Sequence, residues 1–335
     1  MEQARARQDQ LTKPQGSLGV LEDISIRLAG IYGQAVPKIT GKAVIVMAGD
    51  HGVVAEGVSA YPQAVTEQMV YNFAAGGAAI NVLARHAGAK VYVVDVGVAA
   101  PIERDGVLSR KVRPGTGNMA QGSAMSMAEA EQAIRVGMEV ADLAIGAGAN
   151  IIATGDMGIG NTTASSAVVS VLAARPVAEV LGRGTGIDDA GLNRKLSVIE
   201  KSLEINKPDP ASPIDVLAKV GGLEIAGICG VILQAAKRRV PVIIDGFISG
   251  AGALAAARLA PGSVNYMIAS HVSVEPGHRI VLQEIGLQPM LHMSMRLGEG
   301  SGAVLALSLI EAAAKVLAEM ATFADAGVSE SEQGE

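Results

Sequence analysis

The 335-residue chain has few aromatic side chains and almost no cysteine. Phe, Tyr and Trp make up 2% of the residues and Trp is absent, although 49% of the residues are hydrophobic. The core must therefore be built from Ala, Val, Ile, Leu and Met, a composition that suits helices packed on a parallel sheet. A single cysteine, Cys229, excludes an intrachain disulfide and a cysteine-based metal cluster, and its apolar surroundings favour buried packing.

The sequence also lacks clustered positive charge. Its formal net charge is −6 and it has no run of Lys or Arg, so we expect no nucleic-acid partner. Residues 1–17 lack the apolar centre of a signal peptide, which predicts a cytoplasmic protein. Residues 303–323 are strongly apolar, but Glu311, Lys315 and Glu319 recur four apart on one face. We therefore expect an amphipathic helix there, and no membrane partner.

Glycine, by contrast, is abundant, and its 41 residues gather after apolar runs. Short β-branched runs, glycine-rich turns and Ala-rich helical stretches follow one another repeatedly, which is typical of βαβ units. We expect strands at residues 43–49, 91–96, 150–155, 240–246 and 265–270. The crossover helices are predicted at residues 65–87, 128–146, 162–174, 222–238 and 250–259.

The predicted fold class is α/β, with a doubly wound, Rossmann-like parallel sheet. The strands are apolar throughout rather than alternating, so helices should cover both faces of the sheet. Residues 41–289 are expected to form this large domain. Residues 1–40 and 290–325 are mainly helical in pattern and are expected to associate into a smaller helical domain, and residues 326–335 form an acidic tail that we expect to be disordered.

The third predicted strand runs into a glycine-rich segment that opens a helix. Glycine lets backbone amides approach an oxyanion, the helix N-terminus adds free N–H groups and partial positive charge, and threonine hydroxyls can donate. The segment therefore indicates an anion site, although a tight turn with an ordinary N-cap would use the same residues. The candidates are Gly155, Asp156, Met157, Gly158, Gly160, Asn161 and Thr162.

The spacing of these glycines narrows the class of anion site. No Gly-Lys-Ser/Thr follows, so the segment is not a Walker loop, and the pattern G-x-x-G-x-G from Gly155 is not the dinucleotide fingerprint. A second glycine run, which includes Gly182, Gly184 and Thr185, could supply further contacts to the same phosphate or form a surface turn.

Polar residues also follow the first and fourth predicted strands. In an open parallel sheet the ligand lies outside the carboxyl ends of the strands, which gives priority to Asp50, His51 and Asp245. His51 and Asp50 could share a metal ion, but the other histidines show no close ligand spacing. An organising hydrogen-bond role is therefore the favoured interpretation, with no metal.

Glu299 stands between two glycines just before the apolar C-terminal helix. We expect it to be exposed on mobile backbone, yet bordered by Met, Leu and Ala. Partial desolvation of this kind raises the pKa of a carboxylate toward values useful to a general base. A glutamate in the first turn of a helix, favoured by the helix dipole, would have the same spacing.

Taken together, six segments resemble the nicotinate-nucleotide:dimethylbenzimidazole phosphoribosyltransferase family. The resemblance covers about residues 10–323 and is far more specific than any one glycine loop. The segments are Lys13-Pro-Gln-Gly-Ser-Leu-Gly19, Gly49-Asp-His-Gly-Val53, Gly155-Asp-Met-Gly-Ile-Gly-Asn-Thr-Thr163, Lys219-Val-Gly-Gly222, Asp245-Gly-Phe247 and Met295-Arg-Leu-Gly-Glu-Gly-Ser-Gly302.

The resemblance implies transfer of phosphoribose from nicotinate mononucleotide to 5,6-dimethylbenzimidazole in cobalamin biosynthesis, by a homodimer without metal or cofactor. It places the general base on Glu299, the phosphate loop on residues 155–163 with residues 182–185 alongside, and a further lysine on Lys195. It implies a flat, apolar base pocket. Candidates for that pocket are Tyr61, Met69, Leu297 and Gly298, with Arg296 in a supporting role.

Several alternatives remain open at this point. Tyr61 and Met69 fall where members of the family differ, so the acceptor could be benzimidazole, adenine or a phenol instead. A dinucleotide-dependent oxidoreductase would use Asp95, at the end of the second strand, to read a ribose, but it lacks the paired glycine fingerprint. A non-catalytic nucleotide-binding subunit would have no need of Glu299.

Overall fold

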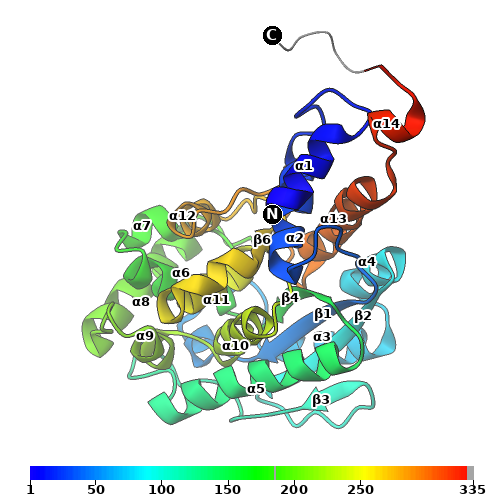
Figure 1. The fold of residues 1–335 in the computed structure, drawn as a ribbon. Coiled ribbons are helices and arrows are strands. Elements are labelled where there is room, and N and C mark those ends of the chain that lie inside the picture. Colours follow the sequence, from blue (N-terminus) through cyan, green and yellow to red (C-terminus); the bar gives the residue numbers. More distant parts are fainter. Residues whose placement is uncertain (185, 330–335) are drawn as a thin grey trace.

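A computed structural model describes residues 1–184 and 186–329, which form a parallel sheet with helices on both faces (Figure 1). The strands lie in the order β3-β2-β1-β4-β5-β6, and every neighbouring pair is parallel. This is the strand order of doubly wound dinucleotide-binding folds. The predicted fold class is confirmed. The strands are β1 (Lys42–Gly49), β2 (Ala89–Gly97), β3 (Val107–Ser109), β4 (Ile151–Met157), β5 (Val242–Ile244) and β6 (Met267–Ala269).

Strand β1 shows why the sheet needs two helical layers. Alternate side chains point to opposite faces of a strand, and Ile45 and Met47 enter one buried cluster while Val44 and Val46 enter another. The first face is covered by α5 (Met127–Gly146), α6 (Asn161–Leu172), α7 (Val177–Val180), α8 (Asp189–Asn206), α9 (Pro213–Val220), α10 (Leu223–Lys237), α11 (Phe247–Leu259) and α12 (Pro276–Glu284). The second face is covered by α2 (Val20–Tyr32), α3 (Ala64–Ala75), α4 (Ala79–Ala87) and α13 (Ser301–Glu319).

Several boundaries differ from the sequence expectations. The helix predicted at residues 65–87 is two helices, because Gly76 ends α3 in the left-handed conformation at φ +79°. Strand β3 was not predicted, since its three residues are too short for a hydrophobic pattern. Helices α7, α8, α9 and α12 were also not predicted. Two short 3-10 helices, η1 (Gly52–Glu56) and η2 (Pro261–Tyr266), complete the elements.

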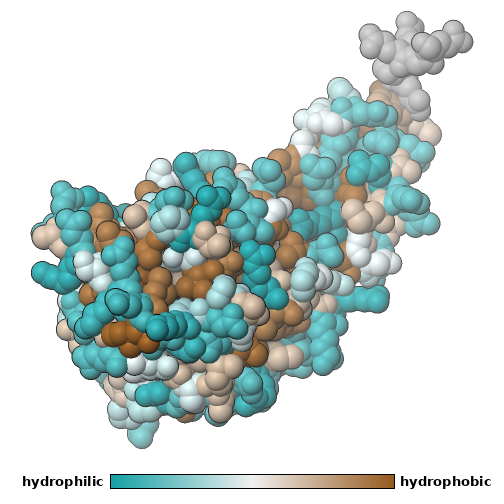
Figure 2. Space-filling model, turned by 90° about the vertical axis from the view of Figure 1, so that its left-hand side faces the viewer, coloured by the Kyte–Doolittle hydropathy of each residue, from teal (hydrophilic) through white to brown (hydrophobic). Residues whose placement is uncertain are grey.

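Helices α1 and α14, near the two ends of the described chain, lie on the same side of the sheet (Figure 1). Helix α1 (Glu2–Gln10) carries Arg7, whose guanidinium donates to the carbonyls of Leu317, Ala318 and Met320 at the end of α13. Helix α14 (Phe323–Ala326) comes directly after α13 in the chain. The space-filling view shows this part as a narrower projection from the main body (Figure 2).

A small core joins these end segments, while α13 also contacts the sheet. Ala4, Ile26, Ala29 and Leu317 form a buried cluster of their own. The division into a helical domain of residues 1–40 and 290–325 and a large domain of residues 41–289 stays a prediction. Of the acidic tail predicted at residues 326–335, residues 330–335 lie outside the described part of the chain.

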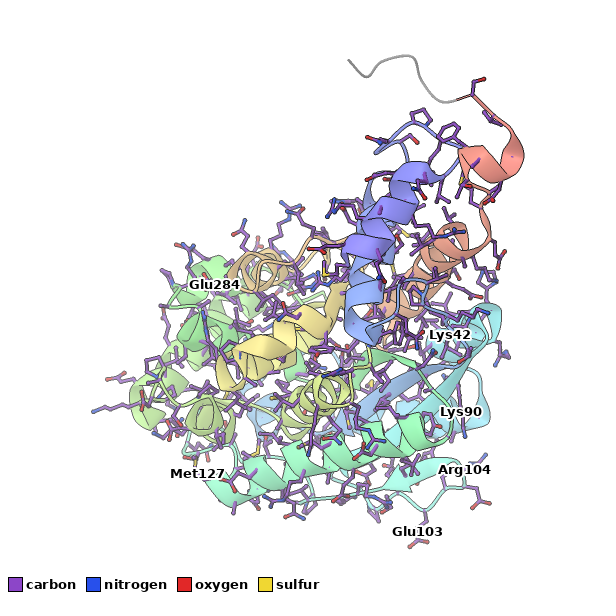
Figure 3. The ribbon with its side chains drawn as sticks, viewed as in Figure 1. Lys42, Lys90, Glu103, Arg104, Met127 and Glu284 are labelled. Carbon is purple, nitrogen blue, oxygen red and sulfur yellow. The ribbon has the colours of Figure 1, made fainter. Side chains whose placement is uncertain are left out.

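Helix α13 is the one helix among the described residues that is long and apolar enough to cross a membrane, judged by length and composition alone. In this fold 56% of its most apolar window is buried inside the protein. Its charged face is anchored to the sheet, because Lys42 at the start of β1 lies 2.5 Å from Glu311 (Figure 3). The helix is therefore part of the core.

Candidate functional site

A cavity of about 440 Å³ opens at the carboxyl ends of β4, β5 and β6. It lies next to the point where the strand order reverses between β1 and β4, the usual ligand position in such sheets. Many of the predicted site residues line it, namely Tyr61, Met69, Asp156, Met157, Gly158, Asn161, Thr162, Gly184, Arg296, Leu297, Gly298 and Glu299. Other lining residues were not predicted, namely Val65, Ile159, Gly246, Phe247, Ile248, His271, Ser273 and Glu275.

The glycine segment after β4 makes the inner wall of the cavity. Gly160 has φ +92° and serves as the N-cap of α6, so the chain passes from strand to helix within a few residues. Gly155 lies so close to the Glu299 segment that a Cβ there would be 2.4 Å from the Glu299 carbonyl oxygen. A Cβ on Gly158 would be 2.3 Å from the carbonyl of Gly49. Glycine is thus required at these positions by packing.

Asp156 lies at the end of β4 and reaches into the cavity from this wall. Its carboxylate accepts a hydrogen bond from the Asn161 amide at 3.1 Å. Burial raises the pKa of Asp156 well above its ordinary value, and the nearby carboxylates of Asp245 and Glu224 add to the rise. A proton on this carboxyl group is correspondingly easier to retain.

A buried charged pair supports the glycine segment from below. His51 Nε2 lies 2.7 Å from Glu224 Oε1, and both side chains are excluded from solvent. Burial lowers the pKa of His51, but the carboxylates of Glu224 and Asp50 outweigh it, so the pKa of His51 is raised. Asp50 accepts from the Ala99 amide at 2.8 Å. Asp50 and His51 thus lie behind the cavity wall and do not line the cavity.

The second glycine run meets the first through Lys195. The Lys195 ammonium, which is fully buried, donates to Thr162 Oγ1 at 2.9 Å and to the Gly182 carbonyl at 3.1 Å. Burial lowers its pKa to about 8, against the opposing charge of Glu275. Gly184 donates its amide to Glu275 Oε1 at 2.9 Å. Thr185 lies outside the described residues.

Glu299 is buried, with 6% of its surface exposed, so the expectation of an exposed side chain was wrong. It stands before the N-cap Gly300 of α13 and has φ +62°, an uncommon backbone conformation for a residue with a side chain. Its Oε2 accepts from the Ile80 amide at 3.1 Å. Burial raises the pKa of Glu299, against the Ile80 hydrogen bond, and the charge of Asp245 raises it further.

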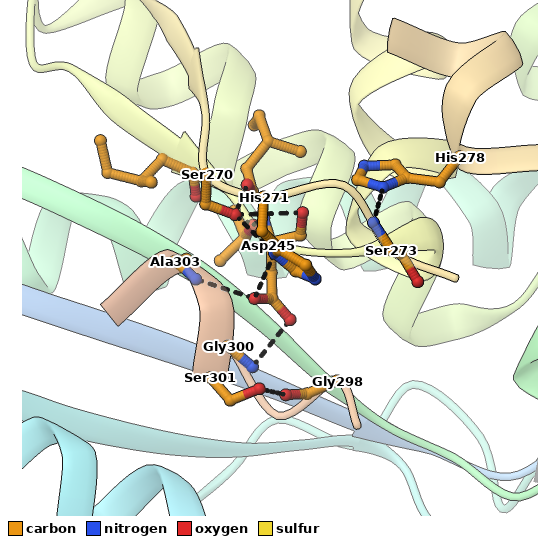
Figure 4. A network of polar contacts seen from close by, with 12 residues as sticks. Asp245, Ser270, His271, Ser273, His278, Gly298, Gly300, Ser301 and Ala303 are labelled. Carbon is orange, nitrogen blue, oxygen red and sulfur yellow. Dashed lines mark hydrogen bonds and ion pairs between the residues drawn. The ribbon is translucent and has the colours of Figure 1, made fainter. Parts of the chain in front are cut away.

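Asp245 holds the Glu299 segment in place, as Figure 4 shows. Its two carboxylate oxygens accept from the amides of Gly300 at 3.2 Å and Ala303 at 2.8 Å. The N-cap of α13 is a glycine without a side chain, so this carboxylate from the end of β5 takes the part of the capping residue. Asp245 itself is buried and acts on the cavity through α13.

The outer part of the cavity is apolar and partly open. Tyr61 and Leu297 are about half exposed at its rim, whereas Met69, Phe247 and Ile248 line it from inside. Among the described lining residues, Arg296 is the one side chain with a permanent positive charge. Its guanidinium lies 3.5 Å from the carbonyl of Gly184, so it reaches across to the second glycine run.

Two observations concern the alternative kinds of site, a metal site and the dinucleotide site of an oxidoreductase. In the described part of the chain, no three His, Cys, Asp or Glu side chains are grouped so that they could hold a metal ion. Asp95, which an oxidoreductase would need for a ribose, is buried and occupied by the Val98 amide at 2.9 Å and by Lys111 at 3.3 Å.

A Rossmann-like sheet with a cavity beside its switch point is the architecture of enzymes that handle nucleotides and related phosphates. The chain belongs to the phosphoribosyltransferase family, because a family model described as "Phosphoribosyltransferase" matches residues 1–328. The protein is therefore an enzyme of the transferase class.

The names of individual relatives describe a more specific activity than the family model does. The chain is 62% identical over 331 residues to the nicotinate-nucleotide–dimethylbenzimidazole phosphoribosyltransferase of Chloroflexus aggregans, covering 98% of this chain and 94% of that protein. It is 61% identical over 328 residues to the enzyme of the same name from Chloroflexus aurantiacus strain J-10-fl, covering 98% and 93%. Its fold matches the crystal structure of CobT from Thermus thermophilus with a TM-score of 0.96 and 51% identity, covering 98% and 99% of the two chains.

Proposed function

We propose that this enzyme moves the 5-phosphoribosyl group of nicotinate mononucleotide to 5,6-dimethylbenzimidazole. The products are α-ribazole 5′-phosphate and nicotinate, and the step belongs to the assembly of the cobalamin nucleotide loop. Relatives that are 61–62% identical over nearly their whole length carry this activity in their names. The observation that carries the proposal is Glu299, a buried carboxylate of raised pKa that lines the same cavity as the glycine segment after β4.

We place the phosphate of nicotinate mononucleotide between the two glycine runs. The N-terminus of α6, whose partial positive charge favours an anion, begins there beside the hydroxyl of Thr162. Lys195 stands behind Thr162 and brings a positive charge to this end of the cavity. Arg296 approaches from the other side. Holding the phosphate at this end fixes the ribosyl group for attack at its anomeric carbon.

Glu299 supplies the base of the proposed reaction. One nitrogen of neutral dimethylbenzimidazole attacks the anomeric carbon, and the N–H of the other nitrogen gives its proton to the Glu299 carboxylate. The new C–N bond forms as the bond to nicotinate breaks. Because the proton leaves as the bond forms, positive charge does not accumulate on the benzimidazole. The raised pKa of Glu299 makes it a stronger base than an ordinary glutamate.

The leaving group explains why one carboxylate suffices. Nicotinate leaves from a pyridinium that is already cationic, so no acid has to protonate it, and the reaction as proposed uses no cofactor. Attack from the face opposite nicotinate inverts the anomeric centre. The carboxyl groups of Glu275 and Glu299 line the cavity. Negative charge there favours the positive charge that develops on the ribosyl carbon in the transition state.

The acceptor base is expected at the apolar end of the cavity. A flat bicyclic ring requires an apolar slot, and Met69, Phe247 and Ile248 supply such surface, with Tyr61 and Leu297 at the rim. Gly298 leaves room beside the carboxylate, since it has no side chain and has φ +84°. In this arrangement the ring N–H faces Glu299.

One experiment tests the proposed function directly. The purified protein is given nicotinate mononucleotide together with dimethylbenzimidazole, benzimidazole, adenine or a phenol, and the products are identified by mass. We expect nicotinate release and α-ribazole 5′-phosphate with dimethylbenzimidazole as the preferred acceptor. The absence of nicotinate release with every acceptor would refute the proposal.

We also propose that the enzyme is a cytoplasmic homodimer in which residues 1–40 and 290–325 form a smaller helical domain beside the sheet. The resemblance to the family supports the dimer, and the small cluster of Ala4, Ile26, Ala29 and Leu317 supports the domain division. Light scattering during gel filtration measures the mass, for which a monomer is 34.0 kDa. A mass equal to one chain at micromolar concentration would contradict the dimer.

A further inference from the structure

His271 is a buried cavity residue that the proposed reaction does not yet use. It follows β6 and is 2% exposed, and it lines the cavity together with Ser273 and Gly246. One edge of its ring packs on the first turn of α13, because a Cβ on Gly302 would be 2.0 Å from Nδ1. The other edge carries Nε2, which lies beside Gly246. The ring therefore presents Nε2 to the cavity.

The hydrogen bonds of Ser270 determine which nitrogen of this ring carries a proton. The Ser270 hydroxyl has two carbonyl acceptors, Ile244 at 2.7 Å and Asp245 at 3.3 Å, and donating to either one uses its one proton. Its oxygen lies 2.9 Å from His271 Nδ1, so it must accept a hydrogen bond from an Nδ1–H group (Figure 4). This hydrogen-bond pattern assigns a proton to Nδ1. Nε2 is an acceptor when the ring is neutral and a donor when it is charged.

Nε2 has no hydrogen bond to any residue that the structure describes. His271 lines the cavity, and an unpaired polar atom on the cavity side of its ring is available to a polar group of a ligand. The neighbouring Asp245 Oδ1 lies 3.9 Å from Nδ1 on the opposite edge of the ring and does not serve Nε2. Nε2 of His271 is thus available to bind a polar group of the substrate.

Resting on the proposed function, we propose that His271 Nε2 binds a ribosyl hydroxyl of the mononucleotide and so selects ribose over deoxyribose. Nicotinate mononucleotide offers two neutral hydroxyls, on C2′ and C3′, as well as anionic phosphate and carboxylate groups. A hydroxyl can both donate and accept, so it pairs with Nε2 whether the ring is neutral or charged. An anion would pair only with the charged ring. The hydroxyl is therefore the one partner that fits both states.

The test compares nicotinate mononucleotide with its 2′-deoxy and 3′-deoxy analogues in wild type and His271→Asn. Asparagine keeps a polar atom within reach of Ser270 but has none at the position of Nε2. The ratio of kcat/KM between ribo and deoxy substrates is taken within each enzyme, so the different intrinsic reactivity of the analogues cancels when the two enzymes are compared. We expect His271→Asn to reduce this ratio by about 5-fold to 10-fold for one analogue and to leave the other unchanged.

Two further variants define the role of the ring. His271→Gln can place an amide near the position of Nε2 and should keep part of the discrimination. His86→Asn, a change of the same chemistry at an exposed position of α4, should leave both ratios unchanged. Should His271→Asn fail to fold, Ser270→Ala removes the acceptor that fixes the Nδ1 proton, and we expect it to lower the same ratio by about 2-fold to 3-fold.

The outcomes separate this inference from the proposed function. Equal ratios in wild type and His271→Asn, or in Ser270→Ala where it replaces that variant, would overturn the role of His271 even if wild type makes the expected product. An equal loss with all three substrates would point to an anion contact or a structural role, and would also overturn it. If wild type releases no nicotinate, the proposed reaction fails, and the same comparison is made on the Kd of the three mononucleotides by calorimetry.

Discussion

The inner wall and the outer rim of the cavity are built in different ways. The inner wall consists of the glycine segment at the end of β4 and of Glu299, with the buried Lys195 behind it, and its shape is set by backbone contacts closer than a methyl group allows. The rim consists of side chains such as Tyr61 and Leu297, which are about half exposed. If the substrates bind as proposed, the position of the phosphoribosyl group is set by the fold, whereas the fit of the acceptor base depends on a few replaceable side chains.

The largest effect is expected at Glu299, the proposed base on the inner wall. Glu299→Gln keeps the oxygen that accepts from the Ile80 amide but cannot take a proton, so kcat should fall by about 100-fold to 10,000-fold. Glu284→Gln, at the far end of α12 in an ion pair with Arg258, is the matched control (Figure 3). Steady-state release of nicotinate measures both. Near-normal turnover in Glu299→Gln, with substrate binding intact, rules out this residue as the base.

The same residue predicts a pH dependence. The active form of Glu299 is the carboxylate, and burial raises its pKa above the ordinary glutamate value. Activity should therefore fall with decreasing pH at a higher pH than an unperturbed glutamate would give, and recover as pH rises through that pKa. A pH profile of kcat measures the shift. An acid limb at or below the ordinary value would contradict the structure.

The next effect comes from adding one methyl group to the inner wall. The Cβ of Gly155→Ala would lie 2.4 Å from the Glu299 carbonyl oxygen, so the Glu299 segment must move. We expect kcat to fall by about 10-fold to 100-fold and stability by about 1–3 kcal/mol. Gly122→Ala is the control, because no atom lies within 4 Å of its Cβ. Thermal unfolding and turnover, measured together, check the result. A Gly155→Ala enzyme indistinguishable from this control contradicts the close packing.

Lys195 should act on substrate binding and do so in a pH-dependent way. Its pKa is about 8, and only the protonated form carries the charge that attracts phosphate. The KM for nicotinate mononucleotide should therefore rise as pH passes through that value, and Lys195→Met should raise it about 10-fold at neutral pH and remove the dependence. Lys201→Met, on the exposed side of α8, is the control. An unchanged alkaline rise in Lys195→Met assigns the titration to another group.

The smallest effect is expected at the rim. Tyr61→Ala and Leu297→Ala remove half-exposed apolar surface and should raise the KM for dimethylbenzimidazole about 2-fold to 5-fold, with little change for nicotinate mononucleotide. The preference between dimethylbenzimidazole and benzimidazole is measured in each variant, with Val82→Ala on α4 as an exposed control. A larger change in the KM for nicotinate mononucleotide than in the KM for dimethylbenzimidazole would contradict the different roles of the inner wall and the rim.

The sequence predicted the inner wall better than the polar residues behind it. The glycine segment and Glu299 stand in local patterns that their neighbours in the chain define, and five strands were recognisable as apolar runs. Glu224 and His271 were not predicted as site residues, because their partners His51 and Asp245 are brought to them by the fold alone. The one local signal for Glu224 was its place just after the segment 219–222. Burial of Glu299 could not be foreseen, since it depends on α4 and β5 packing around a short glycine-rich segment.

The two ends of helix α13 are held by different parts of the molecule. Its first turn is held by Asp245 and begins two residues after Glu299, while Arg7 of α1 holds the carbonyls of its last turn. Nineteen residues of helix span about 28 Å, and a helix of that length behaves as a stiff rod. A protein fused to Met1 would therefore apply its load to a helix whose opposite end adjoins Glu299, the proposed base. For anyone who engineers this enzyme, a fusion at the N-terminus is therefore expected to matter more to the Glu299 segment than the distance along the chain suggests.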